Sequence, residues 1–90
     1  MIVKVFDKDW EVKNPTYKEK REIWKLNSIA FEGGEINQDG YFTLLERVEQ
    51  ISGLNPKDYK DEKGKDLDMG KIDMLLQRIF LNYMGLSKKA

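Results

Sequence analysis

Oxygen-bearing side chains between residues 35 and 46 have the spacing of a calcium-binding loop. The segment EINQDGYFTLLE offers oxygen ligands at positions one, three and five, glycine at six and glutamate at twelve, as an EF-hand loop does. Two features count against calcium: Glu35 stands where the loop needs the shorter aspartate, and two glycines interrupt the incoming helix just before it. The simpler interpretation makes Asn37 or Asp39 the N-cap of a helix. A small calcium-binding regulatory module is therefore an alternative function, and we expect no metal and no cofactor.

The groups that most often carry catalysis are missing from this chain. Its 90 residues include no histidine and no cysteine, so the usual general base and the usual thiol nucleophile are absent. The 16 acidic and 16 basic residues are interleaved, which is typical of solvated helix faces, and the formal net charge is zero. A nucleic-acid binder or a protein that adheres to acidic membranes needs a basic surplus. We expect a non-catalytic cytoplasmic protein that binds neither nucleic acid nor membrane.

Two tryptophans, Trp10 and Trp24, are the remaining candidates for contact with a ligand or partner. Tryptophan is enriched at the hot spots of protein interfaces. In so small a core we favour the alternative, in which both side chains pack a hairpin against the first helix.

The strongest structural signal lies near the C-terminus, over residues 68–85. Apolar residues recur there at spacings of three and four, which predicts a helix with a wide apolar face. Asp68 is the expected N-cap, and Gly85 followed by Leu86 is the expected Schellman stop. A face this wide should pack against at least two neighbouring elements. Its members are Met69, Ile72, Leu75, Leu76, Ile79, Phe80, Tyr83 and Met84.

The preceding elements complete a fold of the mainly α (α+β) class. Alternating side chains predict a β-hairpin over residues 1–13 that turns near Asp7–Asp9. Capping residues and apolar periodicity predict helices over 16–32 and 38–53. The chain is short enough for a single domain, so we expect an N-terminal β-hairpin followed by a three-helix bundle over residues 1–90.

A strongly charged stretch separates the second and third predicted helices. Residues 55–67 include KDYKDEKGKD, which is nearly all charge and contains a glycine. Such a composition predicts a solvated, mobile loop with little fixed structure. A polar tail over residues 87–90 follows the last helix.

The order of these segments resembles a known family. The helix entry NPTYKE, the ending RVEQISGL, a charged loop and LDMGKIDMLLQRIFLNYMGL follow one another as in the small tail assembly chaperones of long-tailed bacteriophages. In many of those proteins an S/T-G-L segment precedes a loop, a leucine-aspartate pair and a terminal amphipathic helix. The matching residues here are Ser52, Gly53, Leu54, Leu67 and Asp68. The family often has aspartate just inside the last helix, where this chain has Gly70 and Lys71.

The resemblance implies a function in virus assembly. Family members produce a short form and, by programmed ribosomal frameshifting, a longer one. The short form coats the tape measure protein, helps to recruit tail tube subunits and is absent from the finished virion. The implied partners are therefore the tape measure and tail tube proteins, and the implied location is the host cytoplasm. A structural connector or adaptor that stays in the phage particle is the first alternative.

A helical groove is the predicted binding surface. The resemblance implies an amphipathic helical partner, and such helices commonly lie in apolar grooves. We place this groove on the last helix and the facing stripe of the second. Its candidate partner-binding residues are Tyr41, Leu45, Val48, Leu76, Phe80 and Tyr83. The alternative is that each of them belongs to the core. An edge-exposed hairpin also favours formation of a homo-oligomer.

Overall fold

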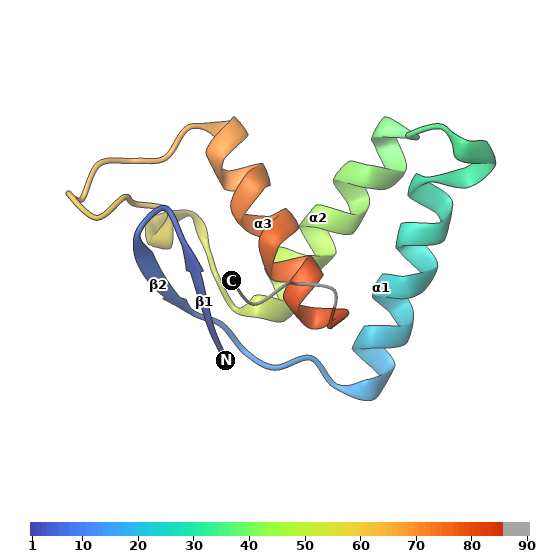
Figure 1. The fold of residues 1–90 in the computed structure, drawn as a ribbon, viewed down its shortest axis with the longest axis horizontal. Coiled ribbons are helices and arrows are strands. Elements are labelled where there is room, and N and C mark those ends of the chain that lie inside the picture. Colours follow the sequence, from blue (N-terminus) through green and yellow to red (C-terminus); the bar gives the residue numbers. More distant parts are fainter. Residues whose placement is uncertain (86–90) are drawn as a thin grey trace.

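The computed structural model describes residues 1–85 and has a two-stranded antiparallel hairpin followed by three α-helices (Figure 1). This architecture confirms the predicted fold class. The Leu86 contact of the expected Schellman stop and the predicted tail 87–90 lie outside the described residues. The elements in chain order are β1 (Ile2–Val5), β2 (Lys8–Glu11), α1 (Tyr17–Ala30), η1 (Glu32–Gly34), α2 (Gln38–Ser52), η2 (Pro56–Asp58) and α3 (Met69–Tyr83).

Side-chain caps begin all three α-helices, and of the two caps considered for the second helix Asn37 rather than Asp39 is the one that forms. The Thr16 hydroxyl accepts from the Glu19 amide while the Glu19 carboxylate accepts from the Thr16 amide, which completes a capping box. Asn37 begins α2 and Asp68 begins α3, and each side chain accepts from a backbone amide of the first turn. Each cap satisfies an amide that the helix itself leaves without a partner.

The hairpin turns earlier than predicted. Val5 pairs with Lys8, so the connecting loop is Phe6 and Asp7, with φ angles of 56° and 57°. A two-residue loop with positive φ at both positions is the type I′ turn, whose twist matches that of the strands. Aspartate tolerates this conformation, whereas phenylalanine rarely adopts it. The Phe6 side chain packs against the core, and this apolar contact favours the turn.

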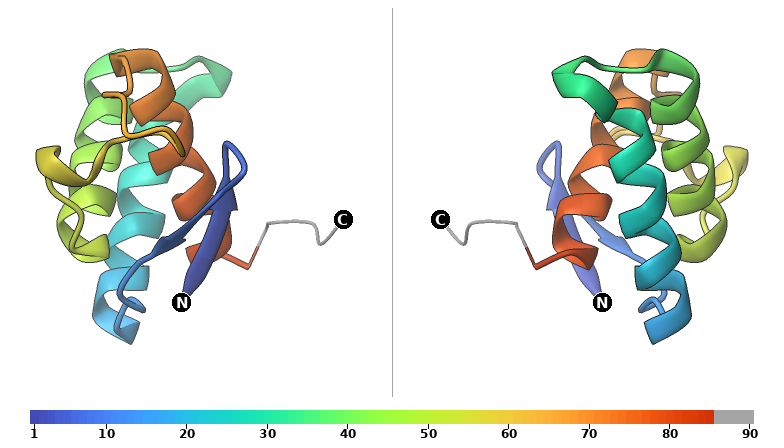
Figure 2. Two further views of the ribbon diagram at one scale, coloured as in Figure 1. Left: turned by 90° about the vertical axis from the view of Figure 1, so that its left-hand side faces the viewer. Right: turned by 90° about the vertical axis from the view of Figure 1, so that its right-hand side faces the viewer.

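Helix α3 lies between the hairpin and the α1–α2 pair (Figure 2). It contacts α2 on one side and β1 on another, and α2 also contacts α1. The wide apolar face therefore meets two neighbouring elements, as its sequence predicts. Its buried residues join those of the hairpin and the other helices in one core. The buried apolar residues are Val3, Trp10, Val12, Ile23, Ala30, Leu44, Leu45, Val48, Ile51, Tyr59, Leu67, Leu75, Leu76, Ile79, Phe80 and Tyr83.

The two tryptophans have different environments. Trp10 is 3 % exposed, and its indole N–H donates to the Val5 carbonyl oxygen at 3.1 Å. Trp24 is 54 % exposed. The prediction that both pack the hairpin against the first helix is wrong, because the hairpin packs on α3. Helix α1 packs on α2, and this packing leaves the Trp24 side chain half exposed.

Candidate protein-binding grooves

Five of the six predicted partner-binding residues belong to the core. Tyr41 is half-buried. The other five are buried because they fill the space between α3 and its neighbours. Val48 is completely buried, so in this structure it belongs to the core and lines no surface groove. Tyr41, Leu45, Leu76 and Phe80 line the two grooves described below, and Tyr83 lines a smaller cavity. The buried five are Leu45, Val48, Leu76, Phe80 and Tyr83, with exposures of 3, 0, 4, 7 and 2 %.

An apolar groove runs between α1 and α3, over the start of α2. We call it the neutral groove, because its only polar side chains apart from the Tyr41 hydroxyl are two amides. Its volume is about 330 Å³, and it is lined by Asn27, Phe31, Tyr41, Leu44, Leu45, Gln77, Phe80 and Leu81. Phe31 is 44 % exposed, and its ring meets that of Tyr41 edge to face with centroids 6.4 Å apart. This contact holds the Phe31 ring in place as an exposed aromatic wall on the α1 side of the groove.

A smaller cavity of about 240 Å³ lies further along the same pair of helices. Lys20 and Trp24 line it from α1, and residues 82–85 line it from the end of α3. Trp24 and Phe31 are seven residues apart, which is close to two helical turns, so they lie on the same side of α1. Sequence reasoning assigned Trp24 to the core. Its spacing from Phe31 was the signal that could have identified an aromatic wall.

A second groove lies between α2 and the N-terminal half of α3. We call it the acidic groove, because all its charged side chains are carboxylates. It has a volume of about 360 Å³, and its lining residues are Phe42, Leu45, Glu46, Glu49, Met69, Ile72, Asp73 and Leu76. Met69 is 74 % exposed and Phe42 is 48 % exposed, so each helix presents one uncovered apolar side chain.

The carboxylates of the acidic groove have no cationic partner among the described residues. Two ion pairs form within residues 1–85, Arg47 with Glu22 and Lys60 with Asp66. Glu49 instead accepts a hydrogen bond from the hydroxyl of the buried Tyr59. Burial raises the pKa of Asp73 above its ordinary value. Burial, followed by the charge of Asp73, also raises the pKa of Tyr41, which belongs to the neutral groove. The two grooves are therefore close neighbours with different charges.

The segment that resembles a calcium loop is largely helical. Helix α2 begins at Gln38, so the second half of the segment cannot wrap around a cation as an EF-hand loop does. Gly40, at position six of the apparent motif, has a packing function. A Cβ there would lie 3.1 Å from Ala30 Cα, so glycine permits the close approach of α1 and α2. Within residues 1–85, no three acidic side chains gather as a metal site.

The charged segment 55–67 is folded, which contradicts the expected lack of fixed structure. Its two buried side chains are Tyr59 and Leu67, and the Leu67 amide donates to the Tyr59 carbonyl oxygen at 3.0 Å. Lys60 and Asp66 then form an antiparallel bridge. These contacts close the charged residues into a turn that is anchored at both ends.

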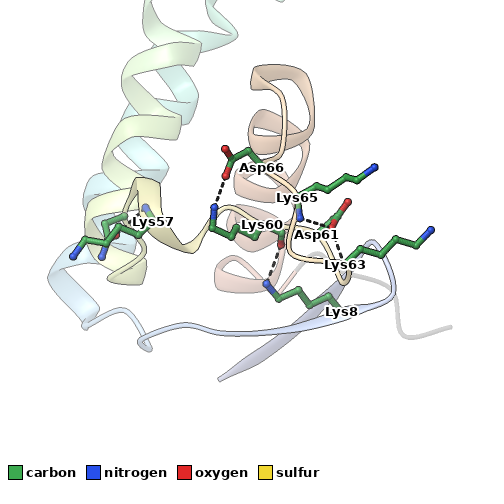
Figure 3. Close-up of polar contacts among 8 residues, drawn as sticks. Lys8, Lys57, Lys60, Asp61, Lys63, Lys65 and Asp66 are labelled. Carbon is green, nitrogen blue, oxygen red and sulfur yellow. Dashed lines mark hydrogen bonds and ion pairs between the residues drawn. The ribbon is translucent and has the colours of Figure 1, made fainter.

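One carboxylate organises the tip of this turn. Asp61 accepts from the backbone amides of Lys63 and Lys65 at 2.8 and 2.9 Å (Figure 3). These hydrogen bonds, with that from Lys65 the stronger influence, lower the pKa of Asp61. Lys8 of β2 donates to the Lys60 carbonyl oxygen at 2.9 Å, which joins the turn to the hairpin. The side chains of Lys63 and Lys65 point outward, so the tip of the turn is a charged surface.

The described residues thus present two apolar grooves and a charged turn. No helix among residues 1–85 combines the length and apolar character needed to cross a membrane. Both grooves are open at the surface and walled by exposed apolar side chains, which is typical of sites for protein segments. No protein-family model, curated protein or solved structure matches this chain.

Proposed function

We propose that this protein is a non-catalytic binding factor that holds an amphipathic helix of another protein in the neutral groove. The observation that carries this proposal is the exposed Phe31, which lines the neutral groove beside a floor of α2 residues, with Trp24 on the same side of α1 at the smaller cavity. Both side chains are about half exposed, although burying a large apolar side chain is worth about 1.5–3 kcal/mol. A partner helix with apolar residues at spacings of three, four and seven would cover them.

In biological terms, we propose a phage tail assembly chaperone. It would bind the tape measure protein, recruit tail tube subunits in the host cytoplasm and be absent from the mature virion. The order of segments supports this assignment by resemblance, and the neutral groove supplies an apolar surface that such a partner requires. A connector or adaptor retained in the phage particle would also need a protein-binding surface. The protein content of purified virions distinguishes the two, since only the connector remains in them.

Trp24 provides a direct test of binding. The chain has two tryptophans and Trp10 is buried, so a Trp10→Phe variant leaves Trp24 as the only indole reporter, at the smaller cavity further along α1 from the neutral groove. This variant is titrated with synthetic amphipathic segments of the tape measure protein from the same genome. We expect a saturable blue shift of the Trp24 emission, because the indole leaves water. A segment whose apolar stripe is replaced by glutamine is the control and should produce no shift.

Matched variants then locate the binding surface. Phe31→Gln should weaken binding at least about tenfold, since truncation of a hot-spot residue costs about 2 kcal/mol or more and about 1.4 kcal/mol is tenfold. Ile36→Gln is the matched control, because Ile36 is 64 % exposed but lines neither groove. Equal affinities of the two variants, or no spectral response to any tape measure segment, would contradict the proposed function.

A further inference from the structure

The acidic groove combines exposed apolar side chains with carboxylates that form no ion pair among residues 1–85. Met69 from α3 and Phe42 from α2 form its exposed walls, and the buried Leu45 and Leu76 form its floor. Exposed apolar side chains that line one cavity favour a bound apolar group more than isolated ones do.

Three carboxylates, Glu46, Glu49 and Asp73, surround these walls. Like charges close together raise the free energy of the unoccupied groove, and a cation would lower it. Asp73 is half-buried, so water solvates its charge poorly, and neither ion pair within residues 1–85 includes these carboxylates. The neutral groove has no charged residue in its lining and therefore provides an internal comparison.

We propose that the acidic groove is a second docking site, for an amphipathic helix that carries lysine or arginine beside its apolar residues. The aliphatic stem of such a side chain would lie against Met69 and Phe42 while its charged end reached Glu46 and Asp73. The inference deepens the proposed function, since it rests on the binding of a helical partner and adds a charge requirement. Charge complementarity selects this occupant, because an acidic or uncharged segment would bury these carboxylates without compensation.

The test uses two synthetic helical peptides of about 18 residues, which is roughly five turns. Both carry the same leucine stripe, flanked by lysine in one peptide and by glutamate in the other. Fluorescence anisotropy of each labelled peptide is measured against the full chain. We expect the lysine peptide to bind at least about tenfold more tightly, and this preference should shrink as salt screens the charges. Equal affinities, or a preference that is independent of salt, would overturn the inference.

Near-isosteric variants assign the preference to the groove. Glu46→Gln combined with Asp73→Asn removes two charges with little change in volume and should abolish the preference, with the fold checked by circular dichroism. Lys4→Gln combined with Glu11→Gln alters exposed charges of the hairpin and should leave the preference for the lysine peptide unchanged. A preference that persists in the Glu46/Asp73 variant would place the cation elsewhere and overturn the inference. The inference would also be overturned if the wild type formed a concentration-dependent dimer that the Glu46/Asp73 variant did not form. The occupant of the groove would then be a second copy of this chain.

The two proposals can fail independently. Phe31 lies outside the acidic groove, so Phe31→Gln should leave the preference for the lysine peptide unchanged. If the tape measure titration shows no binding while the preference for the lysine peptide persists, the proposed function is contradicted and the acidic docking site is supported. If Trp24 responds to a tape measure segment but the two peptides bind equally, the proposed function is supported and the acidic docking site is contradicted.

Discussion

Helix α3 and the charged segment 55–67 are adjacent in the chain and are stabilised in different ways. Along α3 a continuous apolar face meets both α2 and the hairpin, so stability comes from buried area spread over the whole helix. In the charged segment two buried side chains, Tyr59 and Leu67, anchor a turn whose other residues are mostly exposed. Average composition therefore indicates how much of a segment is solvated, whereas one or two buried anchors decide whether it folds.

The largest effect is expected in α3. Leu76→Asp places an unpaired charge at a site that is 4 % exposed, at a cost of several kcal/mol against a total stability of about 5–10 kcal/mol. We expect loss of the cooperative thermal transition in circular dichroism. Met74→Asp is the control, since Met74 is on the same helix but 56 % exposed, and its effect should stay within about 0.5 kcal/mol. A folded Leu76→Asp protein that has only lost binding would show that this face is an interface.

The next effect tests the anchors of the charged segment. Tyr59→Ala should lower the free energy of unfolding by about 3–4 kcal/mol, because it removes a buried aromatic ring and leaves a cavity. Tyr59→Phe removes only the hydroxyl that donates to Glu49 and should cost about 1.5–2 kcal/mol. Urea denaturation measures both. Lys63→Ala, at an exposed position, is the control. If Tyr59→Ala resembled Lys63→Ala, the segment would not be anchored as described.

Local chemistry explains which features the sequence predicts well. Thr16, Asn37 and Asp68 bond to amides within three residues, so the start of each α-helix depends on nearby atoms alone. Periodicity likewise identifies the apolar face of α3, because helix geometry relates neighbours that are close in the chain. The fold class follows from these local signals together.

Features that depend on docking could not be predicted in this way. Trp24 is exposed because the hairpin packs on α3, which is a relation between distant segments. Periodicity identified Tyr41, Leu76 and Phe80 as apolar without showing which atoms a neighbouring helix covers. Tyr59 lies in a charged stretch without periodicity, so only the folded chain reveals it as an anchor.

The two regions should also respond at opposite ends of the pH scale. Burial, followed by the charge of Glu19, raises the pKa of Tyr83 to about 12, and its hydroxyl donates to the Lys13 carbonyl oxygen. The ordinary value is about 10, so between pH 10 and 12 the unfolded chain releases this proton first and stability falls with rising pH. The stability difference between the wild type and Tyr83→Phe should shrink by up to about 1.4 kcal/mol per pH unit there, as measured by urea denaturation. A difference that does not change with pH would contradict this assignment.

The smallest effect is expected at the tip of the charged segment, in acid. Asp61 has a lowered pKa because the backbone amides of Lys65 and Lys63 donate to its carboxylate. Its contribution is therefore present above the ordinary aspartate value and is lost as pH falls through the lowered one. Amide hydrogen exchange at Lys63 and Lys65 should be faster in Asp61→Ala than in the wild type at neutral pH, and this difference should disappear in strong acid. Asp61→Asn keeps one acceptor oxygen and should be intermediate. Because the anchors Tyr59 and Leu67 are untouched, exchange within α3 should not change, and a change there would show that the turn and the helix unfold as one unit.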